Sequence, residues 1–449
     1  MIGKTRMLTR HYTDIGAMLR LAIPLAMAEL GWMFMSVVDT IMVGGLPSSA
    51  VSIGAASVGS ALFYTFAIFG IGLMAGMDTL VSQAFGAGKP ADGWRSLGTG
   101  LLLAALASPV LSAAVILAIP LLGMLGIHPQ VRVQAEGFVR VLVWSLPFLM
   151  FYSAFRRYLQ GLHDVRPVTF ALLTANLVNV VGNWALIYGH LGLPAMGMRG
   201  SALSTVIARI YLVAVLMLAV ALRDPAALRG MRADLTRLRE LLYLGLPAAV
   251  TIGLEVGVFN ASTAVIGKLG PVSLAAHTIA INAAAVSYMI PLGISSAAAV
   301  AVGRAVGAKD PQGATRAGWT AISIGVAWAL VAALVFALLG GPISRIYTSD
   351  PEVIAFAATL FLIAGLFQLF DALQTVATGA LRGIGDTRTA LVWNLVCYWV
   401  IGFPFGCWLG FYLGWGAVGI WCGLCLALVL IGIGLTIRWL NLTSPDNIT

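Results

Sequence analysis

The stretch VIAFAATLFLIAGLFQLFDALQTVATGAL, residues 353–381, contains no basic residue and one acid, Asp371. It is longer than the roughly 20 apolar residues with which a helix crosses the hydrocarbon core of a bilayer. Asp371 lies 11 residues before Arg382. That spacing is a helical rise of about 16 Å, which places Asp371 near the middle of the membrane. A carboxylate at that depth is costly and tends to mark the path of an ion or a substrate.

The composition of the whole chain agrees with a membrane protein. Of its 449 residues, 60% are hydrophobic and 10% are charged, and the mean hydropathy is +0.96. Soluble domains carry about a quarter charged residues. The alternating pattern of a membrane barrel is absent, so we expect an all-α integral membrane protein. Twelve candidate transmembrane helices begin near residues 16, 50, 97, 136, 167, 198, 240, 274, 316, 353, 389 and 416.

The chain has a formal charge of +9, and the distribution of its basic residues along the sequence is explained by membrane topology. With the N-terminus in the cytoplasm and alternating loops, 20 of the 26 basic residues fall on the cytoplasmic side. The six left for the outer half are Arg132, Arg140, Arg199, Arg209, Lys268 and Arg345. This bias predicts a multi-pass protein of the bacterial inner membrane with both termini in the cytoplasm, and no nucleic-acid partner. No small-residue cleavage site precedes the first span, so we expect the N-terminus to be retained.

An internal repeat at an offset of about 222 residues divides the chain into two halves. The segment SQAFGAGKP (82–90) returns as GRAVGAKDP (303–311), and LQGLHDVR (159–166) returns as LRGIGDTR (381–388). Each half holds six spans, so both enter the membrane from the same side, as parallel repeats do. Two such bundles around a central cleft suit alternating access. The expected domains are an N-terminal six-helix lobe at 1–222, a cytoplasmic linker at 223–240 and a C-terminal six-helix lobe at 241–449.

Five acids fall inside the predicted spans: Glu29, Asp39, Asp78, Glu255 and Asp371. Glu255 lies 13 residues before Lys268 and is, like Asp371, near the middle of the membrane. No basic residue of the second half lies at that depth to neutralise them. Two nearby carboxylates in a low dielectric repel each other, and a proton or a cation such as Na⁺ relieves that cost. A cationic, partly apolar substrate would relieve the same cost, so its binding would oppose that of the ion, which is the thermodynamic basis of antiport.

Polar side chains share helix faces in several spans. Gln368, Asp371, Thr375, Thr378 and Arg382 occupy an arc of about 80° on the tenth. In the fifth, the asparagines are spaced i, i+3, i+7 at Asn176, Asn179 and Asn183. Such stripes predict either a polar cavity or a hydrogen-bonded seam that holds helices together. Arg209 lies in the middle of the sixth span, where we expect it to pair with an acid of the first half, with Asp39 as one candidate. Asp78 is expected to cap a helix or to form a pair at the cytoplasmic side.

Motifs of ATP-driven transport and of catalysis are absent from the sequence. AFGAGKP (84–90) lacks the first glycine of a phosphate loop, and its lysine is followed by proline, so any active transport must use an ion gradient. No HExxH motif and no Ser/His/Asp constellation near the acids indicates an enzyme, and no cofactor is expected. The CxxC at Cys422 and Cys425 lies in an apolar helix without a second Cys or His pair, which favours packing residues over a zinc site.

Five segments resemble the multidrug and toxic compound extrusion (MATE) transporters, and the similarity runs over essentially the full chain. They are FQLFDALQTVATGALRGIGDTR, CYWVIGFPFGCWLG, NVVGNWALIYG, VDTIMVG and SQAFGAGKP. Within the family, the acids Glu255 and Asp371 resemble the NorM branch. The resemblance implies twelve helices in two pseudo-symmetric six-helix bundles, a V-shaped outward-open state and cation-coupled efflux of organic cations.

The resemblance also implies functional residues. It places a C-lobe site for Na⁺ or H⁺ at Glu255 and Asp371, and an N-lobe cavity and proton site at Asp39, Asn179 and Asn183. In some relatives a carboxylate occupies the position of Asn183, so its absence argues against the N-lobe alone moving the proton. The residues expected to line the substrate cavity are Phe259, Phe367, Gln368, Thr375, Thr378 and Tyr398. The aromatic ones can stack on flat cations, although each would more commonly be a core or lipid-facing residue.

The sequence therefore predicts a monomeric antiporter that exchanges Na⁺ or H⁺ for cationic, partly apolar drugs and dyes. The alternative is a flippase for lipid-linked oligosaccharides or polyprenyl carriers, whose pyrophosphate cargo calls for a cationic cavity. The central charges here are mainly acidic, and two extra spans common in such flippases are missing. A channel is a further alternative, although buried acids in a two-lobed repeat suit alternating states better.

Overall fold

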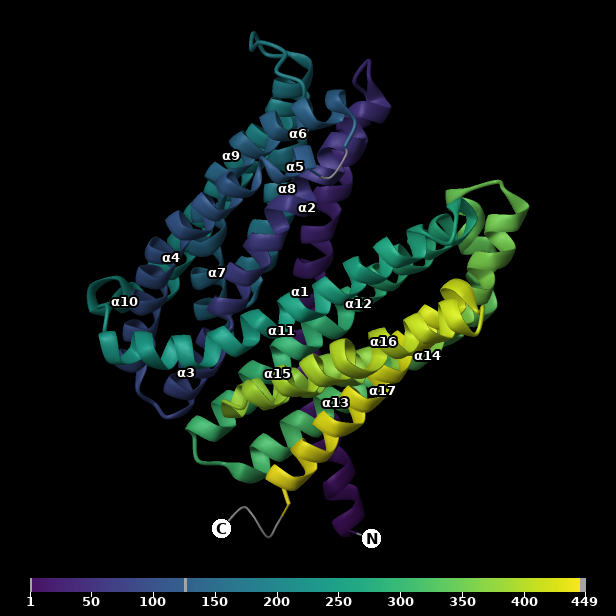
Figure 1. Ribbon diagram of the computed structural model, residues 1–449. Coiled ribbons are helices and arrows are strands. Elements are labelled where there is room, and N and C mark those ends of the chain that lie inside the picture. The colour runs from purple at the N-terminus through teal and green to yellow at the C-terminus, as the bar shows by residue number, and fades with distance from the viewer. Residues whose placement is uncertain (1, 125–126, 445–449) are drawn as a thin grey trace. The chain divides into compact units, whose positions relative to one another are not determined.

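The computed structural model describes the backbone of residues 2–124 and 127–444, and side chains from residue 14 onward within those ranges. The described residues form helices and no strand (Figure 1). The elements are α1 (Ile2–Gly44), α2 (Ser49–Met74), α3 (Gly76–Gly86), α4 (Pro90–Ala118), α5 (Leu121–Met124), α6 (Pro129–Leu142), η1 (Val143–Ser145), α7 (Leu146–Gly161), α8 (Arg166–Tyr188), α9 (Met198–Arg223), α10 (Pro225–Gly230), α11 (Leu235–Gly267), α12 (Pro271–Gly307), α13 (Pro311–Tyr347), α14 (Pro351–Ile384), α15 (Arg388–Asn394), η2 (Leu395–Gly402), α16 (Phe403–Cys407), η3 (Trp408–Tyr412) and α17 (Gly416–Leu442).

Twelve helical stretches of the described chain are long and apolar enough to cross a bilayer, which confirms the predicted number. The third begins at Pro90, earlier than the predicted residue 97. The difference arises because Asp92 and Arg95, read as part of a loop, lie inside the first turns of α4. The cysteines all lie in the last two stretches and are free, with Cys397 and Cys425 buried, in agreement with a packing role.

The sequence repeat is visible in the structure as two equivalent turns, one in each half of the chain. Between α3 and α4, Gly88 has a φ of +68°, and the Lys89 N–H donates to the Ala84 carbonyl at 3.0 Å. Between α12 and α13, Lys309 has a φ of +56°, and the Asp310 N–H donates to the Ala305 carbonyl at 2.9 Å. Both are helix ends closed by a left-handed residue and a bond across six residues. The two halves therefore build the same turn from related sequences.

Helix packing divides the chain into two compact units. One, here called unit A, comprises residues 30–249, and the other, unit B, comprises residues 1–29 and 250–449. Both boundaries fall inside helices, α1 and α11, whereas the lobes expected from the repeat are separated at 223–240. The start of α11 packs in unit A because glycines admit its backbone. A Cβ at Gly72 would lie 2.4 Å from the Ala249 Cα. The lobe boundaries drawn from the repeat stay a prediction.

In unit B, α14 packs against α12, α13 and α17. Its approach to α12 depends on glycine, since a Cβ at Gly379 would lie 2.2 Å from the Ser295 carbonyl oxygen. Small residues at such crossings let helix backbones meet closely inside a membrane. This packing fixes α14, and with it Asp371, in the centre of the unit's helices.

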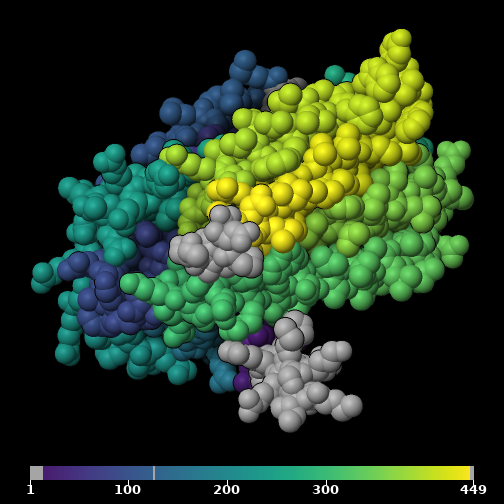
Figure 2. Space-filling view, turned by 90° about the horizontal axis from the view of Figure 1, so that it is seen from below, coloured from purple at the N-terminus to yellow at the C-terminus, as the bar shows by residue number. Residues whose placement is uncertain are grey.

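The eleventh span changes its helical pitch along its length. It contains two π-helical segments, η2 and η3, separated by the short α16, which begins at the Phe403-Pro404 dipeptide. Proline cannot donate to the preceding turn, and π-helical turns are common at functional sites. The segment packs on α17, where a Cβ at Gly423 would lie 2.4 Å from the Gly402 carbonyl oxygen. Figure 2 shows this segment (yellow-green) beside α17 (yellow) at the surface.

In unit A, Asp78 pairs with Arg157, which is one of the two roles expected for this acid. Asp78 lies in the first turn of α3 with no exposed side-chain surface, and the Arg157 side chain on α7 is 11% exposed. Asp224, the N-cap of α10, accepts hydrogen bonds from the Tyr158 hydroxyl at 2.6 Å and the Trp94 ring at 2.9 Å. These bonds tie the connection between α9 and α11 to unit A.

Candidate functional site

The two mid-membrane acids predicted from the sequence lie near each other in unit B. Asp371 on α14 is buried, with 5% of its surface exposed, and Glu255 on α11 is partly exposed. They are close enough for their charges to interact. Tyr288 of α12 lies within range of both acids and of Glu29. Within the described residues, no basic side chain is among the charged groups that interact with Tyr288 or Tyr398.

Aromatic rings pack together on the two helices that carry this acid pair and on the neighbouring segment η2. The Phe259 ring centroid lies 5.8 Å from that of Phe367 and 6.0 Å from that of Tyr398, both in edge-to-face geometry. The Tyr398 hydroxyl donates to Gln374 at 3.4 Å and is fully buried. Trp399 donates to the Leu254 carbonyl, next to Glu255, at 3.0 Å. The π-helical segment η2 therefore presents two consecutive aromatic residues to α14 and α11.

The other residues expected to line the cavity have different surroundings. Gln368 is buried and donates to the Ala284 carbonyl at 3.0 Å, so it joins α14 to α12. The Thr375 carbonyl accepts from Ser295 at 2.7 Å. The hydroxyls of Thr375 and Thr378 are buried and make no hydrogen bond within the described protein. The polar face of α14 therefore serves two purposes. Gln368 bonds the neighbouring helix α12, whereas the hydroxyls of Thr375 and Thr378 are unpaired and lie on the face that also carries Asp371.

A second polar cluster lies in unit A around Asp39 of α1. Asn183 donates to one carboxylate oxygen at 2.6 Å and lies 3.3 Å from the Asn179 side-chain oxygen. Thr205 of α9 donates to the other oxygen at 3.3 Å. Asn176 instead donates to the Gly31 carbonyl at 3.0 Å and is structural. The structure therefore brings together Asp39, Asn179 and Asn183.

Arg209 does not form the expected ion pair. Its two terminal nitrogens donate to the Ser145 hydroxyl at 2.6 Å and the Tyr64 hydroxyl at 3.2 Å. The guanidinium carbon lies 5.5 Å from the Trp32 ring and 5.0 Å from the Phe63 ring. Asp39 is near enough to feel its charge but does not contact it. The pairing prediction is wrong because aromatic faces and hydroxyls take the place of the carboxylate.

The energetics of Arg209 are consistent with a charged side chain. Burying an ion costs several kcal/mol after relaxation. Each cation–π contact returns about 0.5–2 kcal/mol, and Arg209 lies within 6.0 Å of three rings, those of Trp32, Phe63 and Tyr64. Two hydrogen bonds add to this.

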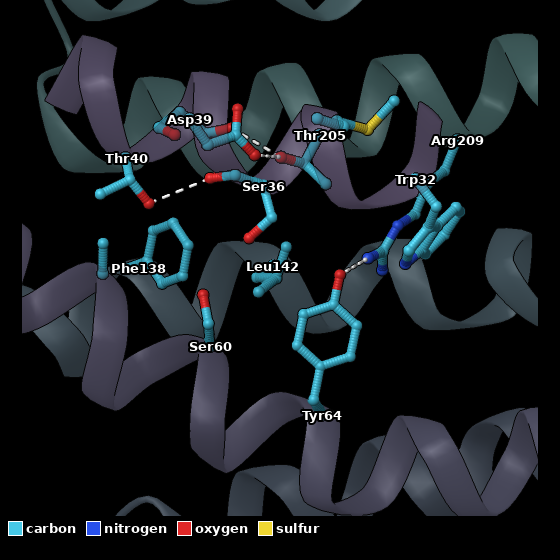
Figure 3. A pocket seen from close by; sticks show the side chains of 13 residues that line it. Trp32, Ser36, Asp39, Thr40, Ser60, Tyr64, Phe138, Leu142, Thr205 and Arg209 are labelled. Atoms are coloured by element: carbon cyan, nitrogen blue, oxygen red, sulfur yellow. Dashed lines mark hydrogen bonds between the residues drawn. The ribbon is translucent and has the colours of Figure 1, made fainter. Parts of the chain in front are cut away.

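Asp39 and Arg209 line a shared cavity of about 30 Å³ in unit A (Figure 3). Its other lining residues come from α1, α2, α6 and α9 and are Trp32, Met35, Ser36, Thr40, Ala56, Ser60, Tyr64, Phe138, Leu142, Ser201 and Thr205. The volume is enough for about two water molecules, and the walls offer hydroxyl groups. The cavity thus combines one acid, one base and several neutral donors.

The sequence did not indicate Tyr288, Thr205 or the rings around Arg209. Tyr288 shares a face of α12 with His277, 11 residues before it, and Ser295, seven residues after it, so a polar stripe could have marked it. Thr205 had a usable signal, because it lies four residues before Arg209 and therefore on the same face of α9.

A cation would find carboxylate and hydroxyl oxygens at both clusters, and oxygen ligands are what hard cations prefer. The described residues include no group of three or more His, Cys, Asp or Glu side chains arranged for a metal ion. The binding of Na⁺ or H⁺ at Glu255 and Asp371 stays a prediction.

Comparison with known proteins gives the family. The MatE family model matches residues 24–185 and 247–408, one match in each half of the chain. The probable multidrug resistance protein NorM of Mesorhizobium japonicum is 36% identical and covers 95% of this chain and 94% of its own. The multidrug resistance protein NorM of Burkholderia vietnamiensis is also 36% identical, and the match covers 97% of this chain and 95% of that protein. The crystal structure of the eukaryotic MATE transporter AtDTX14, 21% identical, superposes with a TM-score of 0.86 over 98% of this chain and all of its own. The chain belongs to the MatE family, the multidrug and toxic compound extrusion transporters.

Proposed function

We propose that the chain is a secondary active multidrug efflux antiporter, which exchanges Na⁺ or H⁺ for organic cations by alternating access across the bacterial inner membrane. Membership of the family and relatives named as multidrug resistance proteins support drug transport. The twelve apolar helices support a multi-pass membrane protein. The distribution of basic residues supports cytoplasmic termini, and we propose that one chain suffices for transport.

The acid pair Glu255 and Asp371 is the observation that supports coupling. Both acids lie in spans, Asp371 is buried, and the charged groups that interact with Asp371 and with the neighbouring Tyr288 are carboxylates. An ion or proton bound there removes the repulsion between the carboxylates, and so does an organic cation. The two ligands then compete for the same electrostatic gain. By reciprocal linkage, each lowers the affinity for the other.

The aromatic cluster next to the pair supports a flat, partly apolar cargo. Phe259, Phe367 and Tyr398 pack edge to face, and of the three only Phe259 is partly exposed. A cation over an aromatic face gains about 0.5–2 kcal/mol per contact. We assign Asp39, Asn179 and Asn183 to a second polar site, in which Asn183 donates to the carboxylate and to the Asn179 side-chain oxygen.

Ethidium efflux from proteoliposomes tests the proposal. An imposed Na⁺ gradient and then an imposed pH gradient are applied to wild type, Asp371→Asn and Glu255→Gln. Glu352→Gln is the matched control, because Glu352 lies in the first turn of the same helix α14 and is exposed. We expect one of the gradients to drive transport in wild type and control, and both site substitutions to reduce the gradient-driven rate by at least tenfold.

Two outcomes contradict the proposal in different ways. If transport survives both substitutions, these acids are structural and coupling must be sought at Asp39. If wild type moves no organic cation under either gradient, the multidrug assignment fails and a lipid-carrier flippase becomes the next hypothesis.

A further inference from the structure

Arg209 is a buried cation that the transport of cations does not explain. Only 2% of the residue is exposed, and it lies near the middle of span Met198–Arg223. A guanidinium has five N–H donors, and the protein accepts from it at Ser145 and Tyr64. Its Nε is buried and has no hydrogen-bond acceptor within the described chain. A buried cation with spare donors and no bonded acid is a place where an anionic group gains free energy.

The surroundings of Arg209 preserve its capacity to bind an anion. Trp32, Phe63 and Tyr64 lie against the guanidinium as rings, and rings stabilise the charge without occupying its N–H donors in the way a carboxylate would. Ser36 and Ser60 line the same cavity and carry hydroxyl donors (Figure 3). The cavity volume of about 30 Å³ suits a carboxylate group and excludes a whole drug.

Asp39 lies in the same cavity and gives it two electrically different ends. Its oxygens accept from Asn183 and Thr205, whereas the guanidinium does not contact them. Thr205 precedes Arg209 by one turn of α9, a rise of about 6 Å, so the acid and the base are offset along the helix. Figure 3 shows Asp39 beside Thr205, and Arg209 beside Trp32 and Tyr64. An anion is therefore repelled from the Asp39 end and attracted to the Arg209 end.

We propose that this cavity is a subsite for a carboxylate carried by the transported molecule, with Arg209 as the residue that determines the preference. The cargo would then be amphoteric, with a carboxylate for Arg209 in addition to its cationic group. That the bound molecule is a transported cargo rests on the proposed function. The binding itself is measured without transport, so the two can fail separately.

A pair of dyes that differ only in the carboxylate tests the subsite. Rhodamine B carries a free carboxyl group and its ethyl ester does not, and fluorescence polarisation gives the Kd of each for the full-length protein in nanodiscs. We expect wild type to bind the acid more tightly than the ester. Arg209→Met, which keeps an unbranched apolar stem and loses the charge, should shift the acid-to-ester Kd ratio at least tenfold, as loss of a charge-assisted hydrogen bond does. Arg209→Lys should shift it less. Arg199→Met, an exposed arginine of the same helix, is the control and should leave the ratio unchanged.

Competition by sodium benzoate identifies the source of the carboxylate. If benzoate displaces rhodamine B from wild type, the subsite also binds free carboxylates. If benzoate does not displace the dye but the acid-to-ester Kd ratio still shifts in Arg209→Met, the carboxylate is recognised only as part of the cargo. Both results support the subsite. Equal Kd values of acid and ester in wild type, without displacement by benzoate, would overturn it even if Arg209→Met fails to fold, and so would an unchanged ratio in that variant. Failure of wild type to transport either dye while the ratio shifts would reject only the transport function.

Discussion

Removing either partner of the Asp78–Arg157 pair should destabilise unit A strongly. Asp78 has no exposed side-chain surface and Arg157 only 11%, so loss of either partner removes a directly bonded opposite charge from a buried side chain. Such a loss costs about 3–5 kcal/mol. For a unit of about this size, each kcal/mol lowers the melting temperature by roughly 2–4 °C, so Asp78→Leu and Arg157→Met should each lower it by about 10 °C. The double substitution replaces both charges by apolar groups and should recover most of the loss.

The assay is thermal unfolding of detergent-purified protein followed by size-exclusion chromatography. The matched control is Arg95→Met, because Arg95 forms a 3.7 Å pair with Asp92 and its side chain is 54% exposed. An exposed pair contributes about 0–1 kcal/mol, so the control should melt within about 3 °C of wild type. The reasoning would be refuted if either single substitution behaved like this control, or if the double variant lost the sum of the two single effects.

Two further predictions concern unit B. Gly423→Leu should prevent the eleventh span from packing on α17, because even a Cβ would lie 2.4 Å from the Gly402 carbonyl oxygen. We expect aggregation, or a free energy of unfolding lower by more than about 3 kcal/mol. A monodisperse protein with the wild-type melting profile would contradict this. Trp421→Phe removes the 3.1 Å hydrogen bond to the fully buried His277 ring and should cost about 1–3 kcal/mol in a thermal unfolding assay, whereas a melting temperature equal to that of wild type would show that this bond does not contribute.

The sequence predicted those features that depend on the length of apolar runs or on residue spacing within one helix. The count of twelve spans follows from the length of apolar runs, and the observed helices match it. The distance from Asp371 to Arg382 predicts the depth of Asp371 in the membrane, and the structure shows that this acid is buried in a helix. The i, i+4 spacing of Asn179 and Asn183 placed both on one face of α8, where they meet around Asp39.

Partners supplied by other helices were not predictable from spacing. Arg209 was expected to pair with an acid, but three rings and two hydroxyls from other helices satisfy most of it. Gln368 shares the face of Asp371 and yet bonds the Ala284 carbonyl of α12. These contacts depend on which helices pack together, and periodicity within one helix carries no information about its neighbour.

The antagonism between drug and ion at Glu255 and Asp371 is the central claim, and the Kd of ethidium in nanodiscs tests it most directly. It is measured by fluorescence polarisation against rising Na⁺ at fixed pH, and against falling pH without Na⁺, in wild type and in Asp371→Asn. The account predicts that one ion raises the wild-type Kd by at least tenfold at saturation, a coupling of about 1.4 kcal/mol or more, and that the Kd of Asp371→Asn stays flat. A wild-type Kd that depends on neither ion, or an Asp371→Asn variant that keeps the full wild-type dependence, would contradict it.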